Sequence, residues 1–119
     1  NFKNIDIILS PALGGIVVGY ETGRQLKIQT IFAERLNSKL TLRRGFEIPV
    51  NSNVLIVEDV ITTGKSALEC SQLLKEYKAN LIGFACIIDR SNDKVLIKDK
   101  IISQVKIKIS TYLLLGQVT

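Results

Sequence analysis

The stretch Val54-Leu-Ile-Val-Glu-Asp-Val-Ile-Thr-Thr-Gly-Lys-Ser66 decides how the rest of this chain is interpreted. It opens with an apolar run, 54–57, typical of a strand that is buried on both faces. Two adjacent carboxylates follow, and a Thr/Gly/Ser turn then leads into a helix-like segment. Carboxylates bind sugar hydroxyls or a hydrated metal ion, and the free N–H groups of a helix N-terminus bind phosphate. The stretch therefore predicts a site for a ligand that carries ribose, phosphate and Mg²⁺.

Segments of strand and helix periodicity alternate along the chain. We predict buried strands over 5–9, 29–33, 54–57 and 81–88, with Ser10-Pro11 ending the first, and a half-exposed edge strand over 105–109. The polar stretch 34–46 is expected to form a long hairpin-like loop. This alternation predicts one α/β domain over residues 1–119, a mostly parallel twisted sheet flanked by helices. In such sheets ligands bind outside the carboxyl ends of the strands, and the polar motifs described here all follow a strand.

Two helices are predicted between these strands. The first covers 14–26, and its buried face would combine Ile16, Val17 and Tyr20 with Gly23 or Leu26. The second covers 66–77 and would turn Leu68, Leu73 and Leu74 inward.

Composition narrows the classes of function. Of the 119 residues 46% are hydrophobic, which argues against a disordered chain, and no apolar run is long enough to cross a membrane. No secretory signal is visible, so we expect a cytoplasmic protein without a membrane partner. The net charge of +5 is spread along the chain and aromatic residues are few, which favours a polyphosphate substrate over nucleic acid. Because the chain has no histidine, Ser–His–Asp triads and Cys–His pairs are excluded, and Cys70 and Cys86 are expected to be buried structural residues.

Two common nucleotide-binding motifs do not fit this sequence. Gly64-Lys65-Ser66 resembles the end of a Walker A motif, but the glycine required four residues before the Gly-Lys pair would fall on Asp59. The spacing of Gly14, Gly15 and Gly19 also differs from that of a dinucleotide fingerprint.

The stretch Glu58–Ser66 resembles the phosphoribosyl pyrophosphate (PRPP) signature of type I phosphoribosyltransferases. Three further stretches resemble the orotate branch of that family: Ser10–Ile16, Phe32–Arg35 with Leu42–Phe46, and Asp89–Ser91. The resemblance runs from about Ile5 to about Ser91 and fades beyond that point. The chain begins at Asn1, almost within a strand, so we expect the family's N-terminal hood over orotate to be missing.

The resemblance implies a role for each motif. Glu58 and Asp59 would bind the ribose hydroxyls, with Asp59 counted among the catalytic residues. The turn that follows would hold the 5-phosphate, so the implied PRPP contacts there are Val60, Ile61, Thr62, Thr63, Gly64, Lys65 and Ser66. Leu13 and Gly14 would face the leaving pyrophosphate, and an unusual cis peptide is expected at Leu13–Gly14. Thr62 and Arg90 would contact orotate.

The stretch Arg35–Arg44 resembles the family's mobile catalytic loop, which reaches across a homodimer. Arg35 and Lys39 are the predicted catalytic and PRPP-binding cations, and a surface hairpin with no catalytic role is the alternative. The sequence departs from the family at Gly14, where many relatives carry Lys, and at Leu36, where some do, and it lacks the loop histidine.

The implied reaction transfers the 5-phosphoribosyl group from PRPP to orotate, giving orotidine 5'-monophosphate and pyrophosphate. Mg²⁺ would be held mainly by PRPP and water, without direct protein ligands. The alternatives are a purine-type phosphoribosyltransferase, a regulatory domain that binds PRPP, and a core that binds PRPP but turns over poorly. The stretches Phe32–Arg35 and Leu42–Phe46 favour the orotate branch over the purine one.

Overall fold

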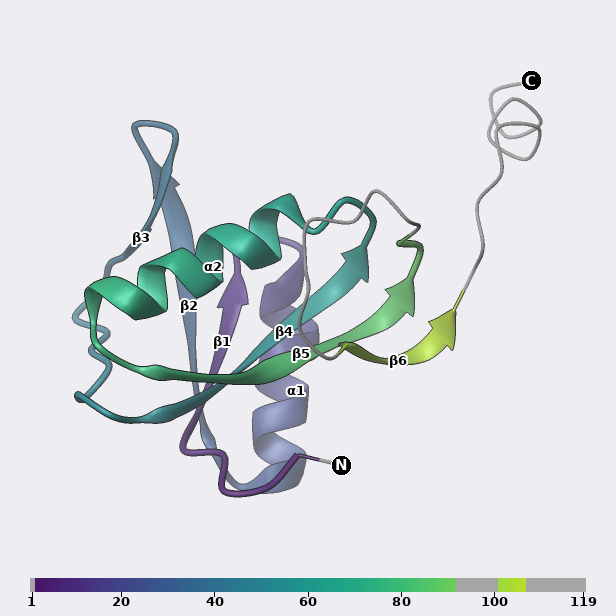
Figure 1. The fold of residues 1–119 in the computed structure, drawn as a ribbon, viewed down its shortest axis with the longest axis horizontal. Coiled ribbons are helices and arrows are strands. Elements are labelled where there is room, and N and C mark those ends of the chain that lie inside the picture. The colour runs from purple at the N-terminus through teal and green to yellow at the C-terminus, as the bar shows by residue number, and fades with distance from the viewer. Residues whose placement is uncertain (1, 92–100, 107–119) are drawn as a thin grey trace.

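The buried apolar runs lie side by side in one twisted sheet in the computed structural model, which describes residues 2–91 and 101–106 (Figure 1). The strand order is β3-β2-β1-β4-β5-β6, and every neighbouring pair is parallel except β2 and β3. The predicted α/β class is confirmed. The strands are β1 (Ile7–Pro11), β2 (Gln29–Leu36), β3 (Lys39–Leu42), β4 (Asn53–Ile61), β5 (Asn80–Asp89) and β6 (Ile101–Lys106).

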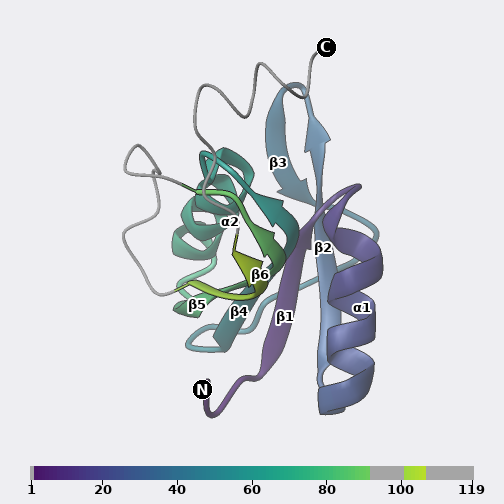
Figure 2. The same cartoon turned by 90° about the vertical axis from the view of Figure 1, so that its right-hand side faces the viewer.

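Two helices of equal length cover opposite faces of the sheet (Figure 2). Helix α1 (Gly15–Leu26) follows β1, and helix α2 (Lys65–Glu76) follows β4. The larger core cluster lies on the α2 side and includes Leu74 and Phe84, while Ile8, Leu55 and Val57 form a smaller cluster that packs with Val18 of α1. Within the described part of the chain, no helix is long and apolar enough to cross a membrane.

The boundaries of several strands differ from the sequence prediction. β1 runs through Pro11, which pairs with Ala33, although Ser10-Pro11 was expected to end it. Because β4 pairs with β1 only as far as Leu9, Pro11 has a partner strand on one side only, which is where proline is tolerated. The stretch 34–46 contains a true hairpin, since Glu34, Arg35 and Leu36 pair antiparallel with β3. The edge position of β6 is confirmed, but the predicted range 105–109 extends beyond the described residues.

The buried face of α1 differs from the prediction. Val17 is 80% exposed and Tyr20 and Leu26 are also exposed, whereas the buried positions are Gly15, Gly19 and Gly23. These glycines recur every four residues and so share one side of the helix. The lack of side chains lets α1 approach the sheet until its backbone lies against the polar side chains of Ser10 and Thr30. In α2, Leu73 and Leu74 are buried as predicted, but Leu68 is only half-buried.

This close contact predicts that Gly23→Ala destabilises the protein. Helix propensity alone would favour alanine by about 1 kcal/mol. The new Cβ, however, would lie 2.0 Å from Thr30 Oγ1 and 2.8 Å from the carbonyl oxygen of Ile28. Since that carbonyl belongs to the backbone, relieving the clash must shift α1 or β2, at a cost typical of overpacking, about 1–3 kcal/mol. Chemical denaturation would measure the net loss.

The matched comparison is Gly19→Ala, whose Cβ would meet the Ser10 side chain, with Oγ at 2.1 Å and Cβ at 3.0 Å. Adding Ser10→Ala should recover much of the stability lost in Gly19→Ala, whereas Thr30→Ala should recover less in Gly23→Ala because the Ile28 carbonyl remains. If Gly23→Ala is as stable as the parent protein, or more stable, close packing of α1 does not matter for the fold.

Candidate functional site

The polar motifs meet at the edge of the sheet where the parallel strands end. β1 and β4 are neighbours, so the turn after β1 lies beside the acidic end of β4 (Figure 1). The contact is close, because a Cβ built on Gly14 would be 2.8 Å from Asp59 Oδ2 and 3.0 Å from Oδ1. A side chain at position 14 would therefore collide with the carboxylate. The glycine turn at Gly14 and the acidic pair that ends in Asp59, 45 positions apart in the sequence, thus come together in one candidate site.

Each of the two turns at this edge leads into a helix whose N-cap residue is a glycine. Gly14 is the N-cap of α1 and Gly64 that of α2, so neither N-cap residue has a side chain that could accept a hydrogen bond from the helix N–H groups. Neither helix has an acidic residue in its first turn. Uncapped N–H groups and the positive end of the helix dipole favour a bound anion. Both helix starts lie at the edge of the sheet that carries Asp59, so this edge offers two places for an anionic group.

The turn after β4 keeps its hydroxyl groups at the surface. Thr62 and Thr63 are exposed, and the Lys65 N–H donates a hydrogen bond to Thr63 Oγ1 at 3.3 Å. Gly64 adopts φ 82°, a left-handed conformation that glycine reaches without steric cost. This bend directs the chain from the strand into α2, which leaves the hydroxyls and the first helical N–H groups on the same side of the turn.

The two carboxylates of Glu58-Asp59 lie in different environments. Both belong to β4, which continues to Ile61, so they lie within the strand rather than beyond its end. Asp59 is half-buried, and its Oδ1 accepts a hydrogen bond from the Val60 N–H at 2.8 Å. Glu58 is only 8% exposed. Burial, followed by the charge of Asp59, raises the pKa of Glu58 to about 8, so near neutral pH Glu58 holds its proton.

Asp59 faces a cavity of about 620 Å³ that runs along α1. Gly14 and Asp59 form its polar end, and the remainder is largely apolar, lined by Val17, Val18, Glu21, Thr22, Gln25, Leu26 and Ile87. The carboxylate of Asp59 is thus open to a ligand.

Comparisons with known proteins agree with this arrangement. The model of the family described as phosphoribosyl transferase domain matches residues 1–114. The chain belongs to this phosphoribosyltransferase family. It is 48% identical over 110 residues to the orotate phosphoribosyltransferase of Chlorobium phaeobacteroides, covering 92% of this chain and 57% of the relative. The orotate phosphoribosyltransferase of Methylorubrum extorquens is 48% identical over 112 residues, 93% of this chain and 57% of that protein.

The chain therefore spans a little over half the length of these curated relatives. Among solved structures, the adenine phosphoribosyltransferase from Thermoanaerobacter pseudethanolicus superposes with a TM-score of 0.76 over 87% of this chain and 70% of that chain. The sequence identity is 17%, so this likeness concerns the fold alone.

In this phosphoribosyltransferase chain the cis peptide lies one residue earlier than predicted, at Ala12–Leu13 instead of Leu13–Gly14. The Ala12 N–H still donates a hydrogen bond to the carbonyl oxygen of Ala33 in β2, at 2.7 Å. Residue 12 is thus the last one held to the sheet, and the chain turns directly after it. Leu13 is 81% exposed at the tip of this turn.

The predicted orotate contact Arg90 follows β5 at the same edge of the sheet. Its backbone N–H donates a hydrogen bond to the carbonyl oxygen of Ile61, at 2.7 Å, which ties the end of β5 to the end of β4. The neighbouring Asp89 is buried and accepts hydrogen bonds from the N–H and the hydroxyl of Ser91. Asp89 is thus held by hydrogen bonds within its own turn.

The two predicted loop cations lie apart from this cavity, on the β2–β3 hairpin. Arg35 forms a bidentate ion pair with Glu69 of α2, at 2.8 and 2.9 Å, and Lys39 pairs with Glu76 at 2.8 Å. Neither cation is among the described residues that line the Asp59 cavity. Glu69 and Glu76 were not singled out in the sequence, because one sequence does not reveal which acid lies opposite which base.

Proposed function

We propose that this chain carries the catalytic core of an orotate phosphoribosyltransferase, which transfers the 5-phosphoribosyl group from PRPP to orotate. The observation that carries the proposal is the contact of the Gly14 backbone with the Asp59 carboxylate, at the edge of the sheet where α1 and α2 both begin after a glycine. PRPP has a matching order of groups: a 5-phosphate, a ribose and a pyrophosphate. The 48% identity to proteins named orotate phosphoribosyltransferase supports orotate as the acceptor.

Each part of PRPP would be bound by a different set of residues. The N–H groups at the start of α2, with the hydroxyls of Thr62, Thr63 and Ser66, would bind the 5-phosphate. The peptide of Leu13-Gly14 would donate N–H groups to pyrophosphate. Asp59 would accept hydrogen bonds from the ribose hydroxyls. A carboxylate in this position also lies close to the positive charge that develops on the ribosyl ring as pyrophosphate departs, so it stabilises the transition state more than the ground state.

Orotate enters the reaction as an anion, so the nucleophile does not depend on a strong base from the protein. Arg90 would hold its carboxylate, for which a guanidinium offers two parallel donors. Placement and charge stabilisation would provide most of the rate enhancement. Arg35 and Lys39 would neutralise pyrophosphate and exclude water once the hairpin approaches the substrate.

Magnesium is part of this proposal as a partner of PRPP. Mg²⁺ usually retains several waters and binds through one or two carboxylates together with substrate phosphates. The described residues contain no group of three or more side chains that could hold a metal ion, and Asp59 presents a single carboxylate to the cavity. The residues fit a magnesium ion that arrives with the substrate. When bound, the ion would supply positive charge to the leaving pyrophosphate.

The wider proposal is a cytoplasmic enzyme of pyrimidine nucleotide synthesis that works as a homodimer with the hairpin shared between subunits. The deciding experiment incubates the full-length protein with Mg²⁺ and PRPP and, in parallel, orotate, adenine, hypoxanthine or uracil. Consumption of orotate alone is the expected result. Consumption of a purine would assign the chain to a purine branch. PRPP binding without turnover of any base would indicate a regulatory domain or an inactive core.

A further inference from the structure

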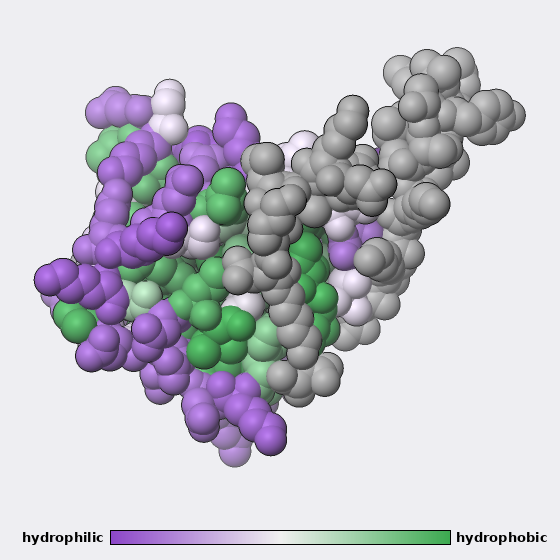
Figure 3. Space-filling view, in the orientation of Figure 1, coloured by the Kyte–Doolittle hydropathy of each residue, from purple (hydrophilic) through white to green (hydrophobic). Residues whose placement is uncertain are grey.

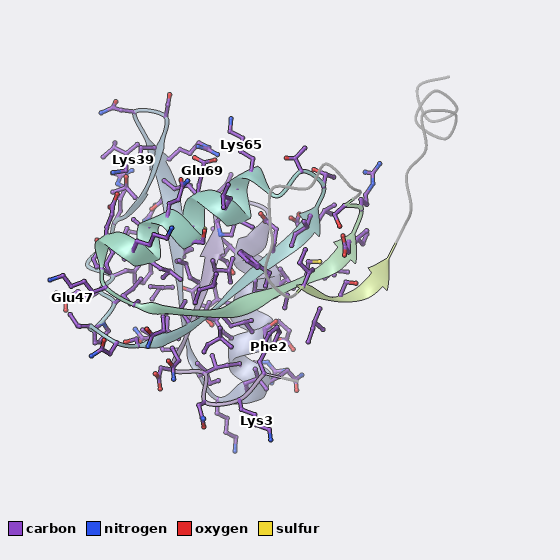
Figure 4. All side chains as sticks on the ribbon, in the orientation of Figure 1. Phe2, Lys3, Lys39, Glu47, Lys65 and Glu69 are labelled. Carbon is purple, nitrogen blue, oxygen red and sulfur yellow. The ribbon has the colours of Figure 1, made fainter. Side chains whose placement is uncertain are left out.

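The β2–β3 hairpin is fastened to α2 by two ion pairs in a row. Glu69, Leu73 and Glu76 lie at helix positions i, i+4 and i+7 and so share one face of α2. The two acids receive Arg35 and Lys39, while Leu73 and Leu40 of β3 are buried between them. Figure 4 shows Lys39 beside the helix and Glu69 on the same side, and Figure 3 shows mostly hydrophilic residues over the hairpin and α2. The contact therefore has an apolar centre, Leu40 and Leu73, which we call the anchor, and one ion pair on either side of it. We call the two ion pairs, Arg35–Glu69 and Lys39–Glu76, the clasp.

Both cations are bound by carboxylates of α2 in this arrangement. Glu76 is the last residue of α2, and the helix begins at Lys65, directly after the phosphate-binding turn. At a rise of 1.5 Å per residue, the Lys39–Glu76 ion pair lies about 16 Å from that turn along the helix axis. The Arg35–Glu69 pair lies about 6 Å along it, and both guanidinium contacts there go to the Glu69 carboxylate. In this arrangement neither cation serves a substrate.

We propose that Glu69 and Glu76 are positioning residues that hold the hairpin in a parked position, from which the substrate's polyphosphate releases Arg35 and Lys39. The inference rests on the proposed function, in which these two cations act on pyrophosphate. In the parked state the carboxylates of Glu69 and Glu76 bind the two cations, and in the closed state the phosphates of PRPP bind the same cations. The two states therefore compete directly. The substrate stabilises the closed state only by the difference between its own contacts and those of the clasp.

The anchor determines which part of the hairpin moves. Leu40 is 3% exposed and belongs to the main core cluster, so β3 stays attached at this residue. The turn beyond it is exposed, and Asn37 and Ser38 at its tip adopt positive φ angles. The hydrogen bond from Arg35 to Glu69 lowers the pKa of that carboxyl, so the pair is charged near neutral pH. Release therefore breaks ion pairs at the surface and leaves the core packed.

The test is the double variant Glu69→Gln/Glu76→Gln, which keeps both side-chain shapes and removes both charges. Exposed ion pairs contribute roughly 0–1 kcal/mol each. Removing the clasp should therefore tighten PRPP binding by roughly two- to fivefold, measured by calorimetry with Mg²⁺ present. The matched control is Glu34→Gln, which breaks the Glu34–Arg44 pair within the hairpin region and leaves both contacts to α2. PRPP affinity in this control should equal that of the parent protein.

The second measurement needs no substrate. Leu36→Cys and Lys75→Cys place spin labels on the exposed ends of the hairpin and of α2, since both native cysteines are buried. The distance distribution should be narrow in the parent and broader when the two glutamates become glutamines. An unchanged distribution overturns the clasp.

A broader distribution with unchanged or weaker PRPP binding overturns the competition with substrate. If the parent protein binds no PRPP, the proposed function fails, while the label distances still decide whether the acids hold the hairpin.

Discussion

Asp59→Asn should lower PRPP affinity or turnover by well over tenfold and leave the fold intact. Each hydrogen bond to a charged group contributes about 1.5–3 kcal/mol, which corresponds to a factor of roughly 10 to 150. Asparagine keeps the shape of the side chain and one carbonyl oxygen, so the hydrogen bond from the Val60 N–H, 2.8 Å in the parent, can persist. The lost charge is the part of Asp59 that a cationic ribosyl group requires. Steady-state kinetics with varied PRPP, alongside thermal denaturation, would separate the two effects.

The matched control is Asp6→Asn, at the opposite end of the same pair of strands. Asp6 Oδ2 accepts a hydrogen bond from the Asn53 N–H at 2.8 Å, just before β1 and at the start of β4. The substitution makes the same chemical change in the same part of the sheet, far from the ligand edge. We expect a small loss of stability and normal kinetics. Unchanged kinetics for Asp59→Asn in an active enzyme would remove Asp59 from the site and, with it, the basis of the proposed function.

The sequence predicted the strands more reliably than the helix surfaces. Buried parallel strands are continuous apolar runs, so the run at 54–57 and its neighbours were visible directly. The edge at which the motifs meet also followed from general rules, because ligands bind where parallel strands end. Gly14 and Asp59 are in contact because β1 and β4 are neighbours in the sheet. No local sequence pattern predicts which strands are neighbours.

The prediction of the buried face of α1 was right for Gly23 and wrong for Val17, Tyr20 and Leu26, because apolar side chains were taken as the inward ones. Glycines at 15, 19 and 23 recur every four residues, and this signal was present in the sequence. It indicates a helix that approaches the sheet through its backbone, but the apolar residues Val17 and Leu26 gave the stronger pattern. The ion pairs of the hairpin with α2 could not be predicted, because they join residues 34 and 37 positions apart by contact in space alone.

Glu58 is the second residue with a large expected effect, and this effect is on stability. Its pKa in the folded protein is about 8, against an ordinary value of 4.5, chiefly because burial disfavours the charged form. The folded state therefore holds this proton more tightly than the unfolded state does. The stabilisation is fully present below about pH 4.5 and is lost as the pH rises through 8. One pKa unit corresponds to 1.36 kcal/mol, so a rise from 4.5 to about 8 should give a loss of about 4–5 kcal/mol over this range.

Glu58→Gln should abolish this pH dependence. The amide has nearly the same shape and no proton to lose, so the variant and the parent should be similar near pH 4.5 and diverge as the pH rises, with the variant more stable by about 4–5 kcal/mol at pH 8 and above. The chain has no histidine, the side chain that otherwise titrates in this window, and the burial-raised pKa values of Cys70 and Cys86 lie above it. Urea denaturation at half-unit steps from pH 4.5 to 9 would trace both curves. Parallel curves across the range would mean that Glu58 is charged in the folded protein at neutral pH and that burial does not raise its pKa.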